Sequence, residues 1–274
     1  MAAADAGGDR RRHHRGRLPV TTPDDGERLR LASADNFRDV AGPGYATRDG
    51  ARLRTGVFYR SNDLRLTDDD HGRIGSIGLR AVIDLRSPTE VDLHPDPAVP
   101  GAEALHFDAI GIPMERMSSL RSREDAVVLM DDVYRTFVTE DRSRTAFGGV
   151  LRQLAIGGPQ LFHCSAGKDR TGWVSALLLH IAGVDDPTIE SDYLLTNARS
   201  AASRARVEAE IAQHLGPDLV GVYEPTLVVA SEYLDSAWTA VATHFGDRTS
   251  YLRDGLGLDD DVLGRLRELL RVTP

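Results

Sequence analysis

The sequence predicts an α/β fold with a mainly parallel central sheet flanked by helices and a helical C-terminal half. Two observations indicate this fold. From about Leu29 onward, short apolar runs of strand length alternate with helical runs, and after the loop near residue 166 only helical runs follow. Such alternation is typical of parallel sheets whose faces are covered by helices. Because no linker interrupts the alternation, residues 29–274 are expected to form a single domain.

The expected strands are four short apolar or β-prone runs. They are "VFYRS" (57–61), "LRAVIDLRS" (79–87), "EALHFDAI" (103–110) and "PQLFHCS" (159–165). Between the first two, residues 66–78 are expected to form a helix with Thr67 as its N-cap, because three acidic residues follow in the first turn.

The remaining regular segments have helical patterns. They cover residues 124–140, 143–158, 170–183, 186–197, 203–215, 224–245 and 259–272. The segment 203–215 carries only a narrow apolar stripe, formed by Val207, Ile211 and Leu215. A single seam of this kind fits an ordinary surface helix, and it also fits a mobile cover that rests on a pocket. The sequence leaves both interpretations open.

The bulk composition excludes several classes of protein. The net charge of -9 argues against a general nucleic-acid binder, which normally has a basic face. The single cysteine cannot form an internal disulfide, and no run approaches the roughly 18 apolar residues of a membrane span. Residues 1–28, rich in Ala, Gly, Arg and Asp, are expected to be a disordered basic arm.

The arginine run at residues 10–12 is not followed by the apolar stretch of a secretory signal. A cytoplasmic location is therefore the expectation, with export by a route that needs no signal peptide left open. The sequence carries no information on the oligomeric state.

The segment with the most chemical information is "HCSAGKDRTG" (163–172), which contains the only cysteine of the chain. It joins a predicted buried strand to a predicted apolar helix. Cys164 is therefore expected at the carboxyl end of a strand, where α/β sheets bind ligands. Gly167 permits the sharp turn into the helix. The backbone N–H groups of such a loop, together with the helix N-terminus, form a site for phosphate or sulfate.

The side chains of this segment suit nucleophilic chemistry on phosphorus. A thiol near a helix N-terminus and cations becomes more acidic, so Cys164 is expected to act as a thiolate nucleophile rather than as a small buried core residue. The planar guanidinium of Arg170 can bind two oxygens of a phosphoryl group. Thr171 is expected to stabilise the thiolate as a leaving group, and His163 is expected to have an orienting role through hydrogen bonds.

Three further segments accompany this motif. They are "NFRDVAG" (36–42), "FYRSNDL" (58–64) and "VIDLRSPTE" (82–90). Together with the cysteine motif they resemble the bacterial atypical tyrosine phosphatase family of the PtpB type, and the likeness covers nearly all of residues 30–270. Cys-x5-Arg alone is moderately specific, whereas the four segments in this order are strongly specific. The resemblance implies a phosphatase-type fold, hydrolysis through a cysteinyl-phosphate intermediate, and a helical lid over the pocket.

The resemblance also implies roles for individual residues. Cys164 matches the nucleophile, Arg170 the phosphate-binding arginine and Asp84 the aspartate taken as the general acid. Asp169 is a second acidic candidate that would serve hydrolysis of the intermediate, and Lys168 matches a lysine that adds positive charge. The residues expected to hold the phosphate are Ser165, Ala166, Gly167, Lys168, Asp169 and Arg170.

Structural roles are the alternative for three of these residues. Asp84 ends an apolar strand and could simply cap a turn. Asp169 could hold the loop by accepting backbone N–H groups. Lys168 could face solvent.

Residues outside the cysteine motif are expected to support it. Arg60 and Arg86 follow predicted strands, and they could line the pocket or pair with acids such as Asp39 or Asp63. Arg38 and Asp39 are expected to brace the loops around the site.

The expected activity is that of a cysteine-dependent phosphatase acting on phosphotyrosine, with phosphoserine, phosphothreonine and phosphoinositides as further candidate substrates. No cofactor or metal is expected, because a mechanism through a thiophosphate needs none, and no Cys/His cluster indicates zinc. Two alternatives stand beside this reading: a non-catalytic phosphate-recognition module with the same pocket, and a hydrolase of small inositol phosphates. The unaltered nucleophile argues against the first of them.

Overall fold

The computed structural model describes residues 29–272, and the expected arm of residues 1–28 lies outside this part. The sheet has five strands in the order β1 (Arg38–Asp39), β2 (Phe58–Ser61), β5 (Gln160–His163), β3 (Ala81–Asp84) and β4 (Glu103–His106). The four longer strands are parallel, whereas β1 runs antiparallel to β2. The prediction of a mainly parallel sheet is therefore confirmed, and the four expected strands are present.

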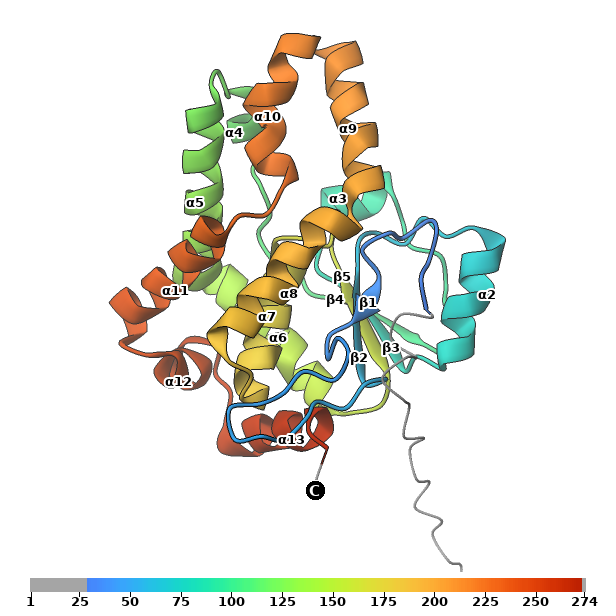
Figure 1. Ribbon diagram of the computed structural model, residues 1–274, viewed down its shortest axis with the longest axis vertical. Helices are drawn as coiled ribbons and strands as arrows, with labels where there is room; N and C mark the ends of the chain where they lie inside the picture. The colour runs from blue at the N-terminus through green and yellow to red at the C-terminus, as the bar shows by residue number, and fades with distance from the viewer. Residues whose placement is uncertain (1–28, 273–274) are drawn as a thin grey trace, which may run out of the picture.

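Helices flank the sheet on both faces (Figure 1). They are α2 (Asp68–Ile77), α3 (Pro88–Leu93), α4 (Met114–Ser118), α5 (Arg123–Thr139), α6 (Asp141–Ala155), α7 (Arg170–Ala182), α8 (Asp186–Arg199), α9 (Ala201–His214), α10 (Val220–Leu227), α11 (Ser231–Phe245), α12 (Arg248–Ser250) and α13 (Asp260–Leu270). Thr67 caps α2 as expected, since its hydroxyl accepts a hydrogen bond from the Asp70 amide. Within residues 29–272, no helix combines the length and the apolar character that crossing a membrane requires.

Two apolar cores hold these layers together. The smaller core joins α2 to one face of the sheet through Ile74, Val82 and Leu161. The larger core includes Ile83 and Phe162 and packs the other face against α5, α6 and α7. Neighbouring residues of β3 and β5 thus point to opposite faces, as the pleat of a strand requires.

The register of the parallel strands brings their carboxyl ends to one edge of the sheet. Ser61 of β2 and Asp84 of β3 both lie opposite His163 of β5. The segments that follow these strands therefore start side by side. This is the edge at which α/β proteins bind ligands.

The expectation of one helix over residues 224–245 is wrong, because the structure divides this region into α10 and α11. The side chain of Asn197 pairs with the backbone at the break. Its Nδ2 donates to the carbonyl oxygen of Val229 at 2.7 Å, and its Oδ1 accepts from the Val229 amide at 2.9 Å. These two bonds satisfy backbone groups that a continuous helix would have paired internally.

The helices α9 and α10 project beyond the sheet at its carboxyl edge (Figure 1). No residue of α9 is buried. Of its apolar stripe, Ile211 packs partly against the larger core, while Val207 is exposed. The helix is therefore held by few apolar contacts, as its narrow stripe predicts.

Candidate active site

The loop that carries the cysteine motif joins β5 to α7. β5 ends at His163 and α7 begins at Arg170, so Cys164 directly follows the strand. Gly167 has a φ of +66°, and a Cβ at this position would lie 2.5 Å from the carbonyl oxygen of Ser61. Both observations make glycine necessary here, because a side chain would be strained and would collide with backbone.

The carbonyl groups of the loop point away from its interior. The carbonyl oxygen of Ser165 accepts from the Asp63 amide at 3.0 Å. The carbonyl oxygen of Gly167 accepts at 2.8 Å from both Arg60 Nη2 and Asn36 Nδ2. By contrast, the N–H groups of residues 165–169 donate to no acceptor within residues 29–272. A loop whose carbonyl groups point outward and whose backbone N–H groups have no acceptor forms an anion-binding nest.

Cys164 lies at the base of this loop and is only 2% exposed. Two buried arginines, Arg170 and Arg60, lie close enough to Cys164 to interact with it electrostatically. The hydroxyl of Thr171, at the start of α7, is buried and has no hydrogen-bond partner among residues 29–272, the sulfur included. A buried donor in this position remains available to a group that enters the loop.

Arg170 is held by Glu90, the last residue of the "VIDLRSPTE" segment, for which the sequence predicts no role of its own. Nη1 and Nη2 of Arg170 each donate to one carboxylate oxygen of Glu90 at 2.7 Å. Glu90 also accepts from the Ser165 hydroxyl and closes a capping box with Ser87 at the start of α3. Burial opposes ionisation of Glu90, but the bonds from Arg170 and Ser165 outweigh it and hold the pKa of this carboxyl well below its usual range.

The Glu90 contact fixes the direction of the Arg170 guanidinium before any ligand arrives. A capping box at residues 87–90 was readable as Ser-Pro-Thr-Glu, which is the one sequence signal that could have drawn attention to Glu90. Nothing in that pattern indicates that the same carboxylate also reaches an arginine 80 residues later.

Asp169 lies next to the nest and has two donors. Lys168 Nζ is 2.6 Å from Asp169 Oδ2, and the Tyr134 hydroxyl donates to Oδ1 at 2.9 Å. Lys168 is buried, so the alternative in which it faces solvent does not hold. The carboxylate of Asp169 thus sits within the loop, at its junction with α7.

Asp84 has a different environment from Asp169. Its carboxylate accepts from Arg86 through Nε at 3.0 Å and 3.1 Å and through Nη2 at 2.8 Å, and it also accepts from the Arg86 amide. Arg86 in turn pairs with Asp96 at 2.9 Å. Arg86 is therefore paired with acids rather than free to line the pocket, and it supplies the positive charge that these carboxylates require.

Asp96 also contacts the residue that precedes the cysteine. His163 Nε2 lies 2.8 Å from Asp96 Oδ2, and His163 Nδ1 lies 3.4 Å from the carbonyl oxygen of Cys164. Burial opposes the charge of Asp96, but contact with His163 and Arg86 outweighs it and lowers the pKa of Asp96. His163 is thus held between a carboxylate and the backbone of the loop, which fits an orienting role.

A second buried ion network supports the loop from the side of β1 and β2. Asp192 of α8 pairs with Arg60 at 3.3 Å and with Arg38 at 3.4 Å. Arg38 also donates to the side chain of Asn36, whose amide group holds the loop. Burial and the nearby charge of Arg38 lower the pKa of Arg60 to about 9, although the charges of Asp192 and Cys164 act in the opposite direction.

Asp39 does not take part in this network. Its carboxylate instead accepts from the amides of Ala41 and Gly56. The two residues of the "NFRDV" segment therefore brace different turns. Arg38 supports the cysteine loop through Asn36 and Asp192, whereas Asp39 fixes the chain that leads into β2.

A cavity of about 410 Å³ opens beside the nest, between the loop and α9. Its floor includes Ser165, Ala166 and Lys168. Four basic side chains are among its lining residues: Arg65, Lys168, Arg204 and Arg206. Two acidic residues, Asp63 and Glu210, also line it, so basic side chains exceed acidic ones by two and the cavity lining is basic in an acidic protein.

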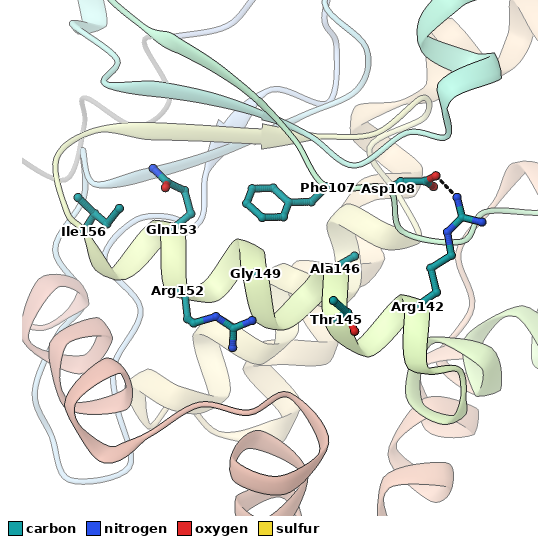
Figure 2. Close-up of a pocket in the computed structure, with 9 residues that line it drawn as sticks. All are labelled: Phe107, Asp108, Arg142, Thr145, Ala146, Gly149, Arg152, Gln153 and Ile156. Atoms are coloured by element: carbon teal, nitrogen blue, oxygen red, sulfur yellow. Dashed lines mark hydrogen bonds and ion pairs between the residues drawn. The ribbon is translucent and has the colours of Figure 1, made fainter.

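A larger and more open groove, of about 720 Å³, lies elsewhere, between the end of β4 and α6 (Figure 2). Phe107 lies over Gly149 there, and Arg142 pairs with Asp108 at one end. None of the loop residues lines this groove. It therefore contains neither the cysteine nor the anion nest, and the smaller cavity beside Cys164 is the candidate active site.

Comparison with known proteins agrees with this assignment. A model of the tyrosine phosphatase family matches residues 29–272. The chain is 35% identical to the triple specificity protein phosphatase PtpB of Mycobacterium tuberculosis, over 88% of this chain and 98% of that protein. It is 36% identical to a putative tyrosine-protein phosphatase of Cupriavidus necator, over 84% of this chain and 85% of that protein.

A tyrosine-protein phosphatase of Nostoc commune is 31% identical over 60% of this chain and 61% of its own length. The family match covers the whole described part of the chain, residues 29–272, and the anion nest around Cys164 lies within it. The resemblance noted from the four segments is therefore confirmed: the chain belongs to the tyrosine phosphatase family.

Proposed function

We propose that this tyrosine phosphatase hydrolyses phosphotyrosine through a covalent intermediate on Cys164. The observation that carries the proposal is the nest: the five backbone amides that follow the buried Cys164 have no acceptor within residues 29–272, and Arg170 at the end of the loop is already aligned by Glu90. Such a site stabilises the three outer oxygens of a phosphoryl group while the sulfur approaches phosphorus in line. A binding-only module would gain nothing from a sulfur at this point.

In the first step of the proposed reaction, the Cys164 thiolate attacks phosphorus and the bond from phosphorus to the tyrosine oxygen breaks. The leaving oxygen takes a proton from an acid of the enzyme. In the second step, a water molecule attacks phosphorus and the phosphorus–sulfur bond breaks. The proton of the water returns to the acid, now a base, and inorganic phosphate leaves. Thr171 would donate to the departing sulfur.

We assign the proton transfers to Asp169 rather than to Asp84. A general acid has to release its proton within hydrogen-bond reach of the leaving oxygen. Asp169 belongs to the loop itself, where Lys168 and Tyr134 each contact one of its oxygens, whereas Asp84 lies outside the loop and accepts three side-chain hydrogen bonds from Arg86. Asp84 is better suited to holding Arg86 and, through Asp96, His163.

A second point concerns the range of substrates. The basic cavity between the loop and α9 extends beyond the nest and is larger than a single phosphoryl group requires. One relative is named a triple specificity phosphatase. We therefore propose that the enzyme also accepts phosphoserine, phosphothreonine and phosphoinositides, and that α9 forms the lid above them. We further propose that residues 29–274 form one catalytic domain, because the larger core draws on residues from Val40 to Leu270.

The test uses the full chain with p-nitrophenyl phosphate and a phosphotyrosine peptide. Turnover should persist in EDTA, fall with vanadate and disappear in Cys164→Ser. Phosphopeptide binding without turnover by the unaltered chain would favour a recognition module instead. A panel of phosphotyrosine peptide, phosphoserine peptide, phosphoinositide and soluble inositol phosphate then ranks the substrates, and a preference for the last would favour the small-molecule hydrolase.

A further inference from the structure

Two buried tyrosines are linked to Asp169 by hydrogen bonds and have no role in the proposed reaction. Tyr134 comes from α5 and Tyr193 from α8, and their side chains are 0% and 1% exposed. The Tyr134 hydroxyl lies 2.9 Å from Asp169 Oδ1 and 2.6 Å from the Tyr193 hydroxyl. Two phenols and one carboxylate therefore form a chain that leads from the interior of the protein to the loop.

The protons of this chain can be assigned by counting. Each phenol has one proton, and a carboxylate oxygen only accepts. Because Tyr134 donates to Asp169, its oxygen is free to accept, and Tyr193 supplies the proton between the two rings. Burial raises the pKa of both phenols well above the usual value, so both remain protonated donors at neutral pH. Every polar atom in the chain is thereby satisfied.

The chain also distinguishes the two oxygens of Asp169. Oδ1 is occupied by Tyr134 on the interior side, whereas the contact of Oδ2 is with Lys168, a residue that lines the cavity. A proton that passes to a leaving group must sit on an oxygen that faces the cavity. Because Lys168, the partner of Oδ2, lines the cavity and Tyr134, the partner of Oδ1, does not, we take Oδ2 as that oxygen.

We propose that Tyr134 is a positioning residue for proton transfer: it holds Oδ1 of Asp169 so that Oδ2 carries the transferable proton, and Tyr193 holds Tyr134 in turn. This inference rests on the proposed function, in which Asp169 is the proton donor. Tyr134 and Tyr193, from helices outside the cysteine motif, thereby join the residues that determine the rate of the phosphatase reaction.

The ordinary alternative is that both tyrosines only fill the core. Tyr134 does pack against Phe137 and Tyr233, with ring centroids 5.1 Å and 5.9 Å away. Replacement by phenylalanine keeps this packing and removes only the hydroxyl. Tyr233 offers a matched control, because it belongs to the same aromatic cluster but its hydroxyl donates to the carbonyl oxygen of Pro225.

The experiment measures kcat/KM for three aryl phosphates whose leaving groups differ in their need for a proton: dinitrophenyl, p-nitrophenyl and phenyl phosphate. The ratio kcat/KM reports the steps up to cleavage of the phosphorus–oxygen bond. Tyr134→Phe should lower kcat/KM roughly tenfold for phenyl phosphate and less than about twofold for the dinitrophenyl ester. This difference is expected for a partial loss of general-acid catalysis. Tyr193→Phe should show the same pattern with a smaller amplitude, and Tyr233→Phe should match the unaltered chain.

Asp169→Asn separates failure of this inference from failure of the proposed function. If Asp169→Asn shows a steep dependence on the leaving group while Tyr134→Phe slows all three esters equally, Asp169 is the acid and the tyrosine has no positioning role. If Asp169→Asn shows no such dependence, the acid has been misassigned and the inference falls with it. If kcat/KM depends steeply on the leaving group in Asp169→Asn and to an intermediate degree in Tyr134→Phe, the result supports Asp169 as the acid and Tyr134 as its positioning residue.

Discussion

Glu90 binds the Arg170 guanidinium through two hydrogen bonds of 2.7 Å, one to each terminal nitrogen. The pair joins the start of α3 to the start of α7, and Glu90 also accepts from Ser165 of the loop. Because both nitrogens are occupied by one planar carboxylate, the guanidinium cannot rotate. The phosphate-binding arginine is thus aligned in advance, which lowers the entropy cost of binding an oxyanion.

Glu90→Gln should weaken this alignment. An amide can accept only one of the two bonds, and a charged hydrogen bond is worth about 1.5–3 kcal/mol. We expect kcat/KM for p-nitrophenyl phosphate to fall roughly tenfold or more. Glu103→Gln, on the exposed edge of β4, is the matched control and should change nothing. Equal rates for both variants would show that Arg170 needs no support from Glu90.

Asp84→Asn should reduce stability rather than proton transfer. The change removes the main counter-charge of Arg86, and breaking a buried ion pair costs about 3 kcal/mol. A lower Tm is therefore expected, with kcat/KM reduced by a similar factor for good and poor leaving groups. A selective loss with phenyl phosphate would instead return the role of general acid to Asp84.

Gly167→Ala should abolish activity. The added Cβ would lie 2.5 Å from backbone of β2, and the residue would keep a φ of +66°. The loop cannot relieve both without moving its amides away from the phosphate. Gly264→Ala in α13 is the control, because its Cβ would meet no atom within 4 Å and alanine favours a helix interior by about 1 kcal/mol. Normal turnover by Gly167→Ala would show that the nest tolerates distortion.

Asp39 should make the folded state less stable as the pH rises. Burial raises the pKa of Asp39 from its ordinary 3.8 to about 7, against the opposing effect of bonds from the Gly56 and Ala41 amides. A carboxyl with a raised pKa in the folded state stabilises it fully below its unfolded pKa, and this contribution is lost as the pH rises through the folded pKa.

The free energy of unfolding should therefore fall between about pH 4 and pH 7 by on the order of 2–4 kcal/mol from this group. Asp39→Asn should flatten that part of the profile, while Asp235→Asn on the exposed face of α11 should leave it as it is. Denaturant titrations at several pH values measure the difference. An unchanged slope in Asp39→Asn would mean that Asp39 is ionised throughout.

Hydrogen exchange should separate α9 from the rest of the fold. No residue of α9 is buried, whereas almost every residue of α7 is. Opening of α9 requires little exposure of apolar surface, so its amides should exchange by local opening, orders of magnitude faster than those of α7. Mass spectrometry of peptides from the two helices measures this. Similar protection in both would rule out α9 as a mobile lid.

Local patterns were sufficient to predict most of the fold. The four parallel strands are short apolar runs, and Thr67 with the acids after it marks the start of α2. The break between α10 and α11 was not readable, because it depends on Asn197, which is about 30 residues away and reaches the backbone of Val229 only in the folded chain. Tertiary contacts of this kind override local helix propensity.

The same distinction applies to the site. The residues of the cysteine motif are adjacent in sequence, so the motif alone indicated an anion nest around Cys164. Glu90 and Tyr134 contact that motif from elements 80 and 35 residues away, and neither sits in a pattern that marks such a contact. The two readings of Asp84 could not be separated either, because the choice depends on how closely Arg86 folds back onto it.

The residues that brace the nest determine when it can fold during synthesis of the chain. Gly167 is braced by Asn36 and Arg60, which precede it by 131 and 107 residues, and Arg60 in turn needs Asp192. Closing such long loops is slow, and it requires that both ends have been synthesised. On the ribosome, the cysteine loop therefore leaves the exit tunnel before Asp192, the last of these braces in the chain, has emerged. Phosphatase activity should therefore appear late in folding, after most of the helices have formed.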